Sequence, residues 1–581
     1  MNRIIVYLVS FFLCNSSIFA QNSLNLDFEL INYGNLLPKN WNVQGTGFKV
    51  SLDSLEKHNG KFSLKTEVSV DPNAIAGGFK GGLPLETFAG KTVEYKGWLK
   101  TKDLKSGYAG LWLRVFGANG VTLQWDNMSD RGLTGDNNWT QVSIKLDIDK
   151  DATDILFGGL FPREGIAWFD DLELYINGEK FIDIIEPEPK KTLSQKEIVA
   201  LKKYIYPLRT YEPDDGNTND LNILNDLIGN SKVVALGENT HGSSEIFKMK
   251  NRIIQYLTVN NGFDIFSIEG SMAESYKIND YTVRGEGDPK KLIADMQVWT
   301  WRTEEVLNMV EWMRKFNQPV QRIQFTGFDM HYYDGAINEL LIMFKGNEEA
   351  ETKITDLKKR LDELQDRAKQ TRGLINVDPD KINEFNSIIS FLQNNTFQPY
   401  NKAWFQQNIV IIQQFLRFNS STWRDKCMAD NFMWIKEQNP KSKFITWAHN
   451  GHIMKTGQVM GAQLAQKLGN DYITFGFTFF DGSYTANGSK GIASYDAIRA
   501  YLGTFEYLLN QLNEPMFILD LKKIKSDNNN ETEWLTERLD FREVGAAGGG
   551  RVEFRNRKII EDFDYLIFIK TSTPSVLFPK P

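Results

Sequence analysis

The chain has 581 residues, of which 41% are hydrophobic and 24% are charged, and its formal net charge is -7. This length exceeds what one hydrophobic core usually holds, so we expect two or more domains. The sequence has no basic stripe and no arginine-rich arm, which argues against a nucleic-acid partner.

Residues 1–20 have the pattern of a secretory leader. Arg3 precedes an apolar run that ends at Cys14, and a short polar stretch then leads to Ala20. We predict cleavage after Ala20 and export to the periplasm or the extracellular space. A lipoprotein leader cut at Cys14 is disfavoured, because Leu13 stands where that signal needs a small residue.

Cleavage would leave Cys427 as the only cysteine of the mature chain. An unpaired cysteine forms no internal disulfide, so stability must come from core packing. No later stretch reaches the roughly 20 apolar residues that a membrane-crossing helix needs. We therefore predict no membrane span.

Short alternating runs separated by Gly, Asn and Asp fill residues 21–183. They include FSLKTEVSV, TVEYKGWLKT, AGLWLRVFG, WTQVSIKLDI, TDILFGGLF and AWFDDLELYING. Runs of this spacing without a helical period predict an all-β sandwich. Trp41, Trp98, Trp112 and Trp125 could stack on sugar rings, although tryptophan at such positions more often packs in a core or at a sheet edge.

A stiff linker at 184–191, IIEPEPKK, leads to a region of different pattern at 192–581. Apolar runs here alternate with helical segments, which predicts an α/β domain with a mostly parallel sheet flanked by helices. The candidate strands are residues 232–238, 263–270, 323–330, 443–449, 471–479, 514–521 and 564–571.

A helical insertion is expected at about 335–440, between the third and the fourth candidate strand. Ile354, Leu357, Leu361, Leu364 and Ala368 follow a 3-4-3-4 spacing in a charged background, as in an amphipathic helix. The insertion could cover the active-site end of the sheet as a lid, or it could be a subdomain without a gating role.

Ionisable residues stand at the ends of four predicted strands. These residues are Glu238, Glu269, Asp329 and His449, and His241 and His452 lie three residues beyond the first and the last of them. Parallel strands deliver such side chains to one crevice at the carboxyl edge of the sheet. Imidazoles and carboxylates together suit general acid/base catalysis, because a histidine can take a proton from water while a carboxylate fixes its tautomer.

Six motifs resemble the erythromycin esterase family in order and spacing. They are GENTHG (237–242), SIEG (267–270), WTWRTEE (299–305), TGFDMH (326–331), RDKCMADN (424–431) and WAHNGHI (447–453). The resemblance implies hydrolysis of a lactone or another ester, with His241 as the general base that activates water. It also implies acid/base or orienting roles for Glu238, Glu269, His449 and His452, and substrate binding for Lys250, Asp329 and Arg424.

The amino-terminal module, with LNLDFE near its start and AWFDDLELYI near its end, resembles jelly-roll domains of the carbohydrate-binding type. That resemblance implies a glycan as a second partner, beside a small ester or lactone as substrate.

Other chemistries are less well supported by the residues. Two histidines at 449 and 452 could hold a divalent metal, but the HExxH pattern is absent and we predict no obligatory cofactor. No GxSxG elbow is present, and Ser243 and Ser244 are better read as helix N-caps. The glycine-rich run 545–550 lacks the Lys-Ser/Thr of a phosphate loop and favours an active-site loop.

Three functions remain open from the sequence. The leading one is an exported ester or lactone hydrolase of the macrolide-esterase type. An esterase that acts on acylated glycans is the second, and a non-catalytic carbohydrate- or surface-binding protein on an esterase-like scaffold is the third, because fold alone does not fix function.

Overall fold

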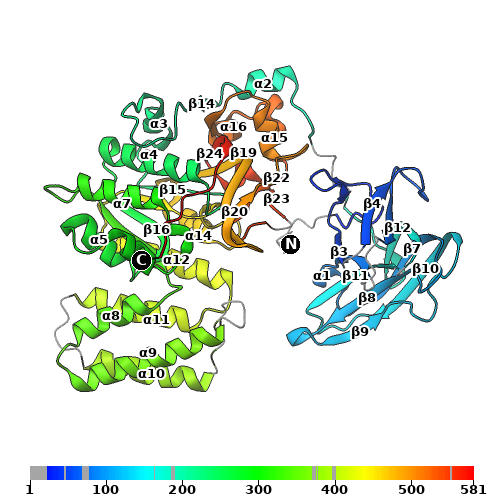
Figure 1. Ribbon diagram of the computed structural model, residues 1–581, viewed down its shortest axis with the longest axis horizontal. Helices are drawn as coiled ribbons and strands as arrows, with labels where there is room; N and C mark the ends of the chain where they lie inside the picture. The colour runs from blue at the N-terminus through cyan, green and yellow to red at the C-terminus, as the bar shows by residue number, and fades with distance from the viewer. Residues whose placement is uncertain are drawn as a thin grey trace, which may run out of the picture. The chain divides into compact units, whose positions relative to one another are not determined.

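The computed structural model describes residues 23–44, 48–68, 77–161, 164–184, 190–368, 375, 377, 379–395, 401–549 and 552–580. The chain divides into two compact units, Met1–Pro189 and Lys190–Pro581 (Figure 1). The predicted leader and residues 185–189 of the predicted linker lie outside the described residues.

The first unit is an antiparallel β-sandwich. One sheet has the order β10-β7-β12-β5-β4, with β13 paired to β12, and the other has the order β3-β6-β11-β8-β9. The strands are β3 (Asn42–Gln44), β4 (Phe48–Asp53), β5 (Ser63–Val68), β6 (Gly77–Gly82), β7 (Thr92–Lys102), β8 (Gly110–Phe116), β9 (Thr122–Asp126), β10 (Asn137–Asp147), β11 (Asp154–Phe161), β12 (Ile166–Ile176) and β13 (Glu179–Lys180). A pair, β1 (Ile31–Asn32) and β2 (Leu37–Pro38), precedes them, and a short helix, α1 (Leu85–Phe88), follows β6.

Strict alternation along β7 shows why this sequence forms a sandwich. Val93, Tyr95 and Leu99 are fully buried between the sheets, while Glu94, Lys96 and Trp98 point to the other side. The four tryptophans named from the sequence also differ in burial. Trp41 and Trp112 are buried, Trp98 is half-buried, and Trp125 on β9 is 46% exposed.

The second unit is built on a mixed sheet with the order β14-β21-β24-β19-β15-β18-β16-β17. The strands are β14 (Ile205–Pro207), β15 (Val233–Leu236), β16 (Ile265–Ser271), β17 (Gln324–Asp329), β18 (Phe444–Trp447), β19 (Tyr472–Gly488), β21 (Met516–Asp520) and β24 (Tyr565–Ser572). The strands from β24 to β17 run parallel, and β21 lies antiparallel to β24. The predicted α/β class, with a mostly parallel sheet, is confirmed.

Helices cover both faces of this sheet, and successive side chains of a strand pack alternately into two cores on opposite faces. Val234 and Leu236 of β15 pack into one core, and Val233 and Ala235 pack into the other. Burial on both faces explains why these strands read as continuous apolar runs. One core includes α4 (Ser244–Asn261), α5 (Ser275–Arg284), α6 (Pro289–Asp295) and α7 (Glu304–Phe316).

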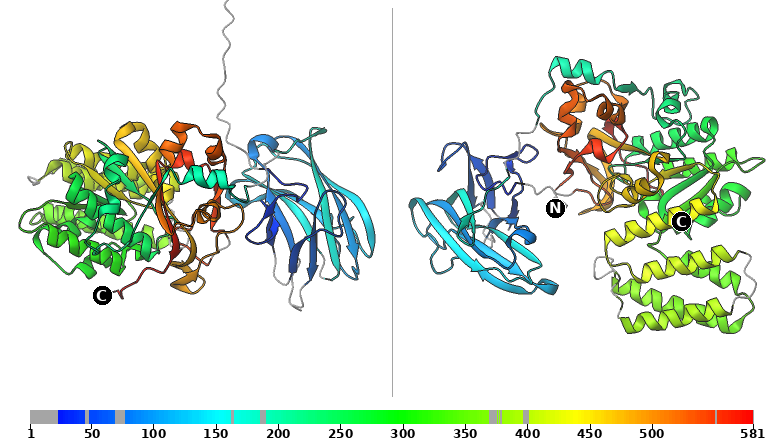
Figure 2. Two further views of the ribbon diagram at one scale, coloured as in Figure 1. Left: turned by 90° about the horizontal axis from the view of Figure 1, so that it is seen from above. Right: turned by 180° about the vertical axis from the view of Figure 1, so that it is seen from behind.

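The opposite core contains the helices of the insertion. They are α8 (Asp334–Met343), α9 (Glu348–Ala368), α10 (Pro379–Asn394), α11 (Lys402–Leu416) and α12 (Ser421–Gln438), and α9 and α10 lie side by side (Figures 1 and 2). Ile354, Leu357 and Leu361 are fully buried along the predicted stripe. The insertion is therefore present between β17 and β18, and its action as a lid stays a prediction.

Smaller elements complete the second unit. They are α2 (Gln195–Leu201), α3 (Leu224–Ile228), α13 (Asn450–Ile453), α14 (Met460–Leu468), β20 (Gly491–Asp496), α15 (Phe505–Asn510), α16 (Leu521–Asp527), β22 (Leu539–Arg542), β23 (Phe554–Arg557) and α17 (Ile559–Asp562). Within the described part of the chain, no helix has both the length and the apolar composition needed to span a bilayer.

Candidate active site

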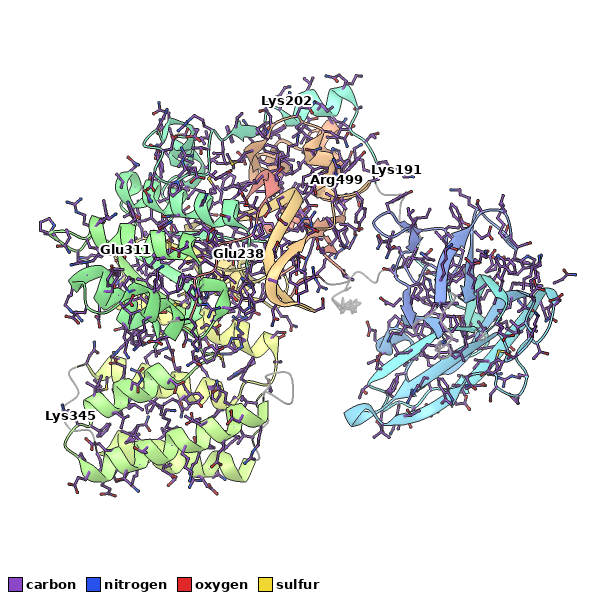
Figure 3. The ribbon with its side chains drawn as sticks, viewed as in Figure 1. Lys191, Lys202, Glu238, Glu311, Lys345 and Arg499 are labelled. Atoms are coloured by element: carbon purple, nitrogen blue, oxygen red, sulfur yellow. The ribbon has the colours of Figure 1, made fainter. Side chains whose placement is uncertain are left out.

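Four neighbouring strands bring the predicted cluster to one edge of the sheet. Asp329 is the last residue of β17, and Glu269 lies near the end of β16. Glu238 comes two residues after β15, and His449 comes two residues after β18. Figure 3 shows Glu238 in the middle of the α/β unit, with Lys345 at its edge.

Glu238 and His241 form a buried carboxylate–imidazole pair. The His241 Nδ1–H donates to Glu238 Oε1, with 2.9 Å between the two atoms. This bond leaves the lone pair of the neutral ring on Nε2. Burial alone would raise the pKa of Glu238, but the charge of Lys250 and the His241 hydrogen bond outweigh it and hold that pKa below its usual value. His241 thus has the tautomer of a general base.

The turn that carries His241 is fixed on both sides. The His241 backbone N–H donates to the Gly545 carbonyl at 3.2 Å, and the Gly242 carbonyl accepts the Thr485 N–H at 2.9 Å. A Cβ at Gly242 would lie 1.8 Å from the Thr485 carbonyl oxygen, so only glycine fits here. Ser243 then caps α4, as predicted, by accepting the Ile246 N–H.

Lys250 lies on α4, fully buried behind this pair. Its ammonium forms an ion pair with Glu238 Oε2 and stands 4.5 Å from the centre of the Trp447 ring. Burial lowers the pKa of Lys250 to about 8, against the opposing effect of Glu238. Because Lys250 is fully buried against Glu238, its charge helps to keep that carboxylate ionised.

Arg424, on α12, joins two carboxylates of the cluster. Its Nη2 donates to Glu269 Oε1 at 2.7 Å and to Asp329 Oδ2 at 2.6 Å. Glu269 and Asp329 are only 6% and 3% exposed, and burial alone would raise their pKa values. The charges of Arg424 and nearby histidines outweigh burial and hold both pKa values well below the usual range.

His452 completes this second group. Its Nδ1 lies 2.8 Å from Asp425 Oδ1, and its Nε2 lies 3.1 Å from Arg424 Nη1 and 3.4 Å from Glu269 Oε1. Burial lowers the pKa of His452, but Glu269 and Asp425 outweigh it and raise that pKa above its usual value. The ring is therefore held between two carboxylates.

His449 differs from the other two histidines. The Gly451 N–H donates to His449 Nδ1 at 3.1 Å, so the neutral ring carries its hydrogen on Nε2. Nε2 is buried and has no hydrogen-bond partner among the described residues. Burial, followed by the charge of His241, lowers the pKa of His449 to about 4. A neutral N–H donor thus lies beside His241, whose ring centre is 5.2 Å away.

Within the described part of the chain, no group of three or more His, Cys, Asp or Glu side chains is arranged to hold a metal ion. Between Glu269 and Asp329, where a cation would balance two carboxylates, the guanidinium of Arg424 supplies the charge.

A family model described as Erythromycin esterase matches residues 259–572. The chain belongs to the erythromycin esterase family. The matched span contains Glu269, Asp329, Arg424, His449 and His452, and the stretch from Glu238 to Lys250 precedes it.

One curated relative carries the same family name, and two solved structures are similar to parts of the chain. "Erythromycin esterase type II" of Escherichia coli is 26% identical over 329 residues, which are 48% of this chain and 76% of that protein. A crystal structure described as a succinoglycan biosynthesis protein is 26% identical, with a TM-score of 0.57, over 66% of this chain and 98% of that one. The CBM22-1 xylan-binding domain of Paenibacillus barcinonensis Xyn10C is 16% identical, with a TM-score of 0.20, over 26% of this chain and 90% of that one.

The structure brings every residue predicted for the esterase site into one connected cluster. Of the three residues that the family resemblance assigns to substrate, Lys250 pairs with Glu238, and Arg424 pairs with Asp329. Asp425 was missed, although it directly follows Arg424 in the RDKCMADN motif. Trp301, within the WTWRTEE motif, also borders the cluster: its indole N–H donates to the Glu269 carbonyl at 3.0 Å, and its ring packs against His241.

Proposed function

We propose that this chain is an exported hydrolase that cleaves a carboxylic ester or lactone with water activated by His241. Family membership supports a hydrolase of the esterase type. The observation that carries the finer proposal is the buried Glu238–His241 pair, which leaves a basic nitrogen beside the unpartnered N–H of His449.

In the proposed reaction, His241 Nε2 takes a proton from water, and the water oxygen bonds to the carbonyl carbon of the substrate. The carbonyl oxygen becomes negative and accepts a hydrogen bond from His449 Nε2–H, which stays neutral because its pKa is about 4. The bond to the alcohol oxygen then breaks, and His241 returns its proton to that oxygen. The products are a carboxylic acid and an alcohol, or one hydroxy acid from a lactone.

Two classes of substrate are proposed. A macrolide lactone follows from the relative named as an erythromycin esterase. An acylated glycan is the alternative, and the neighbour named as a succinoglycan biosynthesis protein makes it worth testing.

The test is a hydrolysis panel of macrolides, aryl esters and acetylated glycans, run on the purified chain with and without a chelator. We expect hydrolysis of at least one ester class and the same rate after chelation, because His241 rather than a metal activates the water. Loss of activity on chelation, with recovery on adding a divalent metal, would contradict the metal-free mechanism. If no compound on the panel is hydrolysed and the chain binds glycans, the non-catalytic binding protein is favoured.

For the sandwich, we propose polysaccharide binding on the outer face of the β3-β6-β11-β8-β9 sheet. Trp125 is half-exposed there, with the guanidinium of Arg114 5.4 Å from its ring centre. Trp112 lies 5.9 Å from Trp125, and its buried indole N–H has no partner among the described residues. An exposed ring beside unpaired or charged donors suits a sugar, which offers both an apolar face and hydroxyl groups.

In native gels that contain soluble xylan or another polysaccharide, migration of the Trp125→Ala variant should be slowed less than migration of the wild type. We expect its affinity to fall about fivefold or more, because one stacking ring contributes about 1 kcal/mol or more beyond its area. The matched control is Leu55→Ser, which changes a 93% exposed apolar residue elsewhere on the sandwich. Equal retardation of wild type and Trp125→Ala on every polysaccharide would contradict this site.

A further inference from the structure

A buried polar network lies directly behind the turn that carries His241, and the mechanism above does not use it. Its members are almost completely inaccessible to water: Asn239, Thr478, Glu506 and Arg542 are 0% exposed, and Glu553 is 3% exposed. Burying polar groups costs folding free energy unless they are hydrogen-bonded, and a hydrogen-bonded buried network makes the structure around it rigid.

Glu506, in the first turn of α15, is the centre of this network. Its Oε1 accepts the Thr478 hydroxyl at 2.6 Å and the Arg542 backbone N–H at 2.9 Å. The same Thr478 hydroxyl oxygen accepts the side-chain N–H of Asn239 at 3.3 Å. Asn239 stands between Glu238 and Thr240 in the catalytic turn. One carboxyl oxygen is thus linked to that turn through a single hydroxyl.

The other arm of the network reaches His241 through the main chain. From Arg542 the chain continues to Val544 and Gly545, whose N–H groups donate to the Asn239 carbonyl at 2.7 and 3.2 Å. The Gly545 carbonyl then accepts the His241 N–H at 3.2 Å. Glu506 is therefore connected to the turn that carries His241 by two routes, one through Thr478 and Asn239 and the other through Arg542 and Gly545.

We propose that Glu506 is a positioning residue for His241 and that it acts as a neutral carboxyl group. The proposal rests on the proposed function in taking His241 as the base. Val544 and Gly545 would then serve to connect Glu506, through Arg542, with the turn that carries His241.

The neutral form follows from how the charges and donors are distributed. The Arg542 guanidinium donates to Glu553 Oε2 at 2.5 Å and to the carbonyls of Phe479, Phe480 and Ile498, and none of its described bonds reaches Glu506. The second oxygen of Glu506, Oε2, is buried without a partner, and the buried Asn239 Oδ1 is an acceptor that also lacks one. Burial raises the pKa of Glu506 above its usual value and outweighs the charge of Arg542 and the two accepted hydrogen bonds, which act to lower it. A protonated Oε2 removes an unpaired buried charge, which an ionised group would leave there.

The test compares Glu506→Gln, Glu506→Ala and Thr478→Val in the full chain. Glutamine keeps the acceptor oxygen and the neutral charge, so we expect kcat within about threefold of the wild type and an unchanged pH profile. Alanine and valine each break the link to Asn239, so kcat should fall about tenfold or more with little change in KM, as for a slightly misplaced base. The matched control is Thr446→Val, a fully buried threonine on β18 outside the network, which should keep wild-type kcat.

A second readout does not depend on finding the substrate. Diethyl pyrocarbonate modification of His241 is followed by peptide mass mapping, with His58 of the sandwich as the internal reference. We expect His241 to react several-fold faster relative to His58 in Thr478→Val and Glu506→Ala, and at the wild-type ratio in Glu506→Gln and Thr446→Val. This ratio keeps its meaning even if the wild type hydrolyses nothing on the panel.

Two results would overturn the proposal. Wild-type kcat and a wild-type modification ratio in Thr478→Val would show that the network does not position His241. A loss in Glu506→Gln as large as in Glu506→Ala would show that the carboxyl group must be ionised. If Glu506→Ala does not fold, the comparison of Glu506→Gln with Thr478→Val still decides both points.

Discussion

Replacing His241 by alanine is expected to lower kcat for the best ester on the panel at least ~100-fold, the usual scale of a general base. KM should change little, because the ring acts on water rather than on the substrate. The reason lies in the pair that His241 forms. Glu238 Oε1 accepts its Nδ1–H at 2.9 Å, so the free lone pair of the neutral ring is on Nε2. The measurement is steady-state kinetics of the purified variant on that ester.

The matched control is His58→Ala, which removes a histidine from the sandwich. It should keep kcat within the error of the wild type. Hydrolysis by His241→Ala at the wild-type rate would remove His241 from the mechanism. Another group near His449 would then have to act as the base.

The sheet of the second unit could be predicted because its strands are buried on both faces. The run Val233–Leu236, for example, is apolar throughout and bounded by polar residues, which favours a buried strand over other assignments. β14 has only three residues, including Pro207, and could not be recognised from its own pattern. β14 forms because it pairs with β21 in the antiparallel direction. This pairing depends on the assembled sheet and not on the local sequence of β14.

The cluster itself could also be predicted, because the carboxyl ends of parallel strands meet at one edge. The contacts of the individual residues in the cluster could not be predicted from the sequence. Arg424 is 155 residues from Glu269 and 95 from Asp329 in the chain, and only folding shows that its guanidinium is shared by both. The same holds for His449, whose free Nε2–H depends on a bond from Gly451 to the other ring nitrogen.

Glu506 is an example of a residue that sequence reasoning had no means of finding. It lies on a six-residue helix, α15, and its partners come from β19 and the end of β22. A glutamate near a helix start reads as an ordinary first-turn acidic residue. Its link to the turn that carries His241 appears only in the folded structure, where Asn239 and Glu506 both bond to the Thr478 hydroxyl.

Replacing Arg424 by alanine is expected to lower the free energy of unfolding of the α/β unit by about 3–5 kcal/mol, the range for breaking one partner out of a buried ion pair. Glu269 and Asp329 would be left as buried carboxylates without their shared cation, and His452 would lose its Arg424 contact. Urea unfolding of the purified variant, followed by tryptophan fluorescence, measures the change. The control is Lys426→Ala, whose side chain is 54% exposed in a pair with Asp430, and which should change stability by less than about 0.5 kcal/mol.

The pH dependence separates the loss of this cation from a simple loss of packing. In the wild type, Arg424 helps to hold the pKa values of Glu269 and Asp329 below the usual range, so their contribution is present above about pH 4 and is lost as the pH falls further. In Arg424→Ala, burial without the cation should raise both pKa values, so the folded state binds more protons than the unfolded state. Stability of the variant should then increase as the pH falls from about 7 to about 5. A destabilisation that is the same at both pH values would show that Arg424 acts through packing alone, and adding Asp329→Asn should recover part of the loss only if charge is the cause.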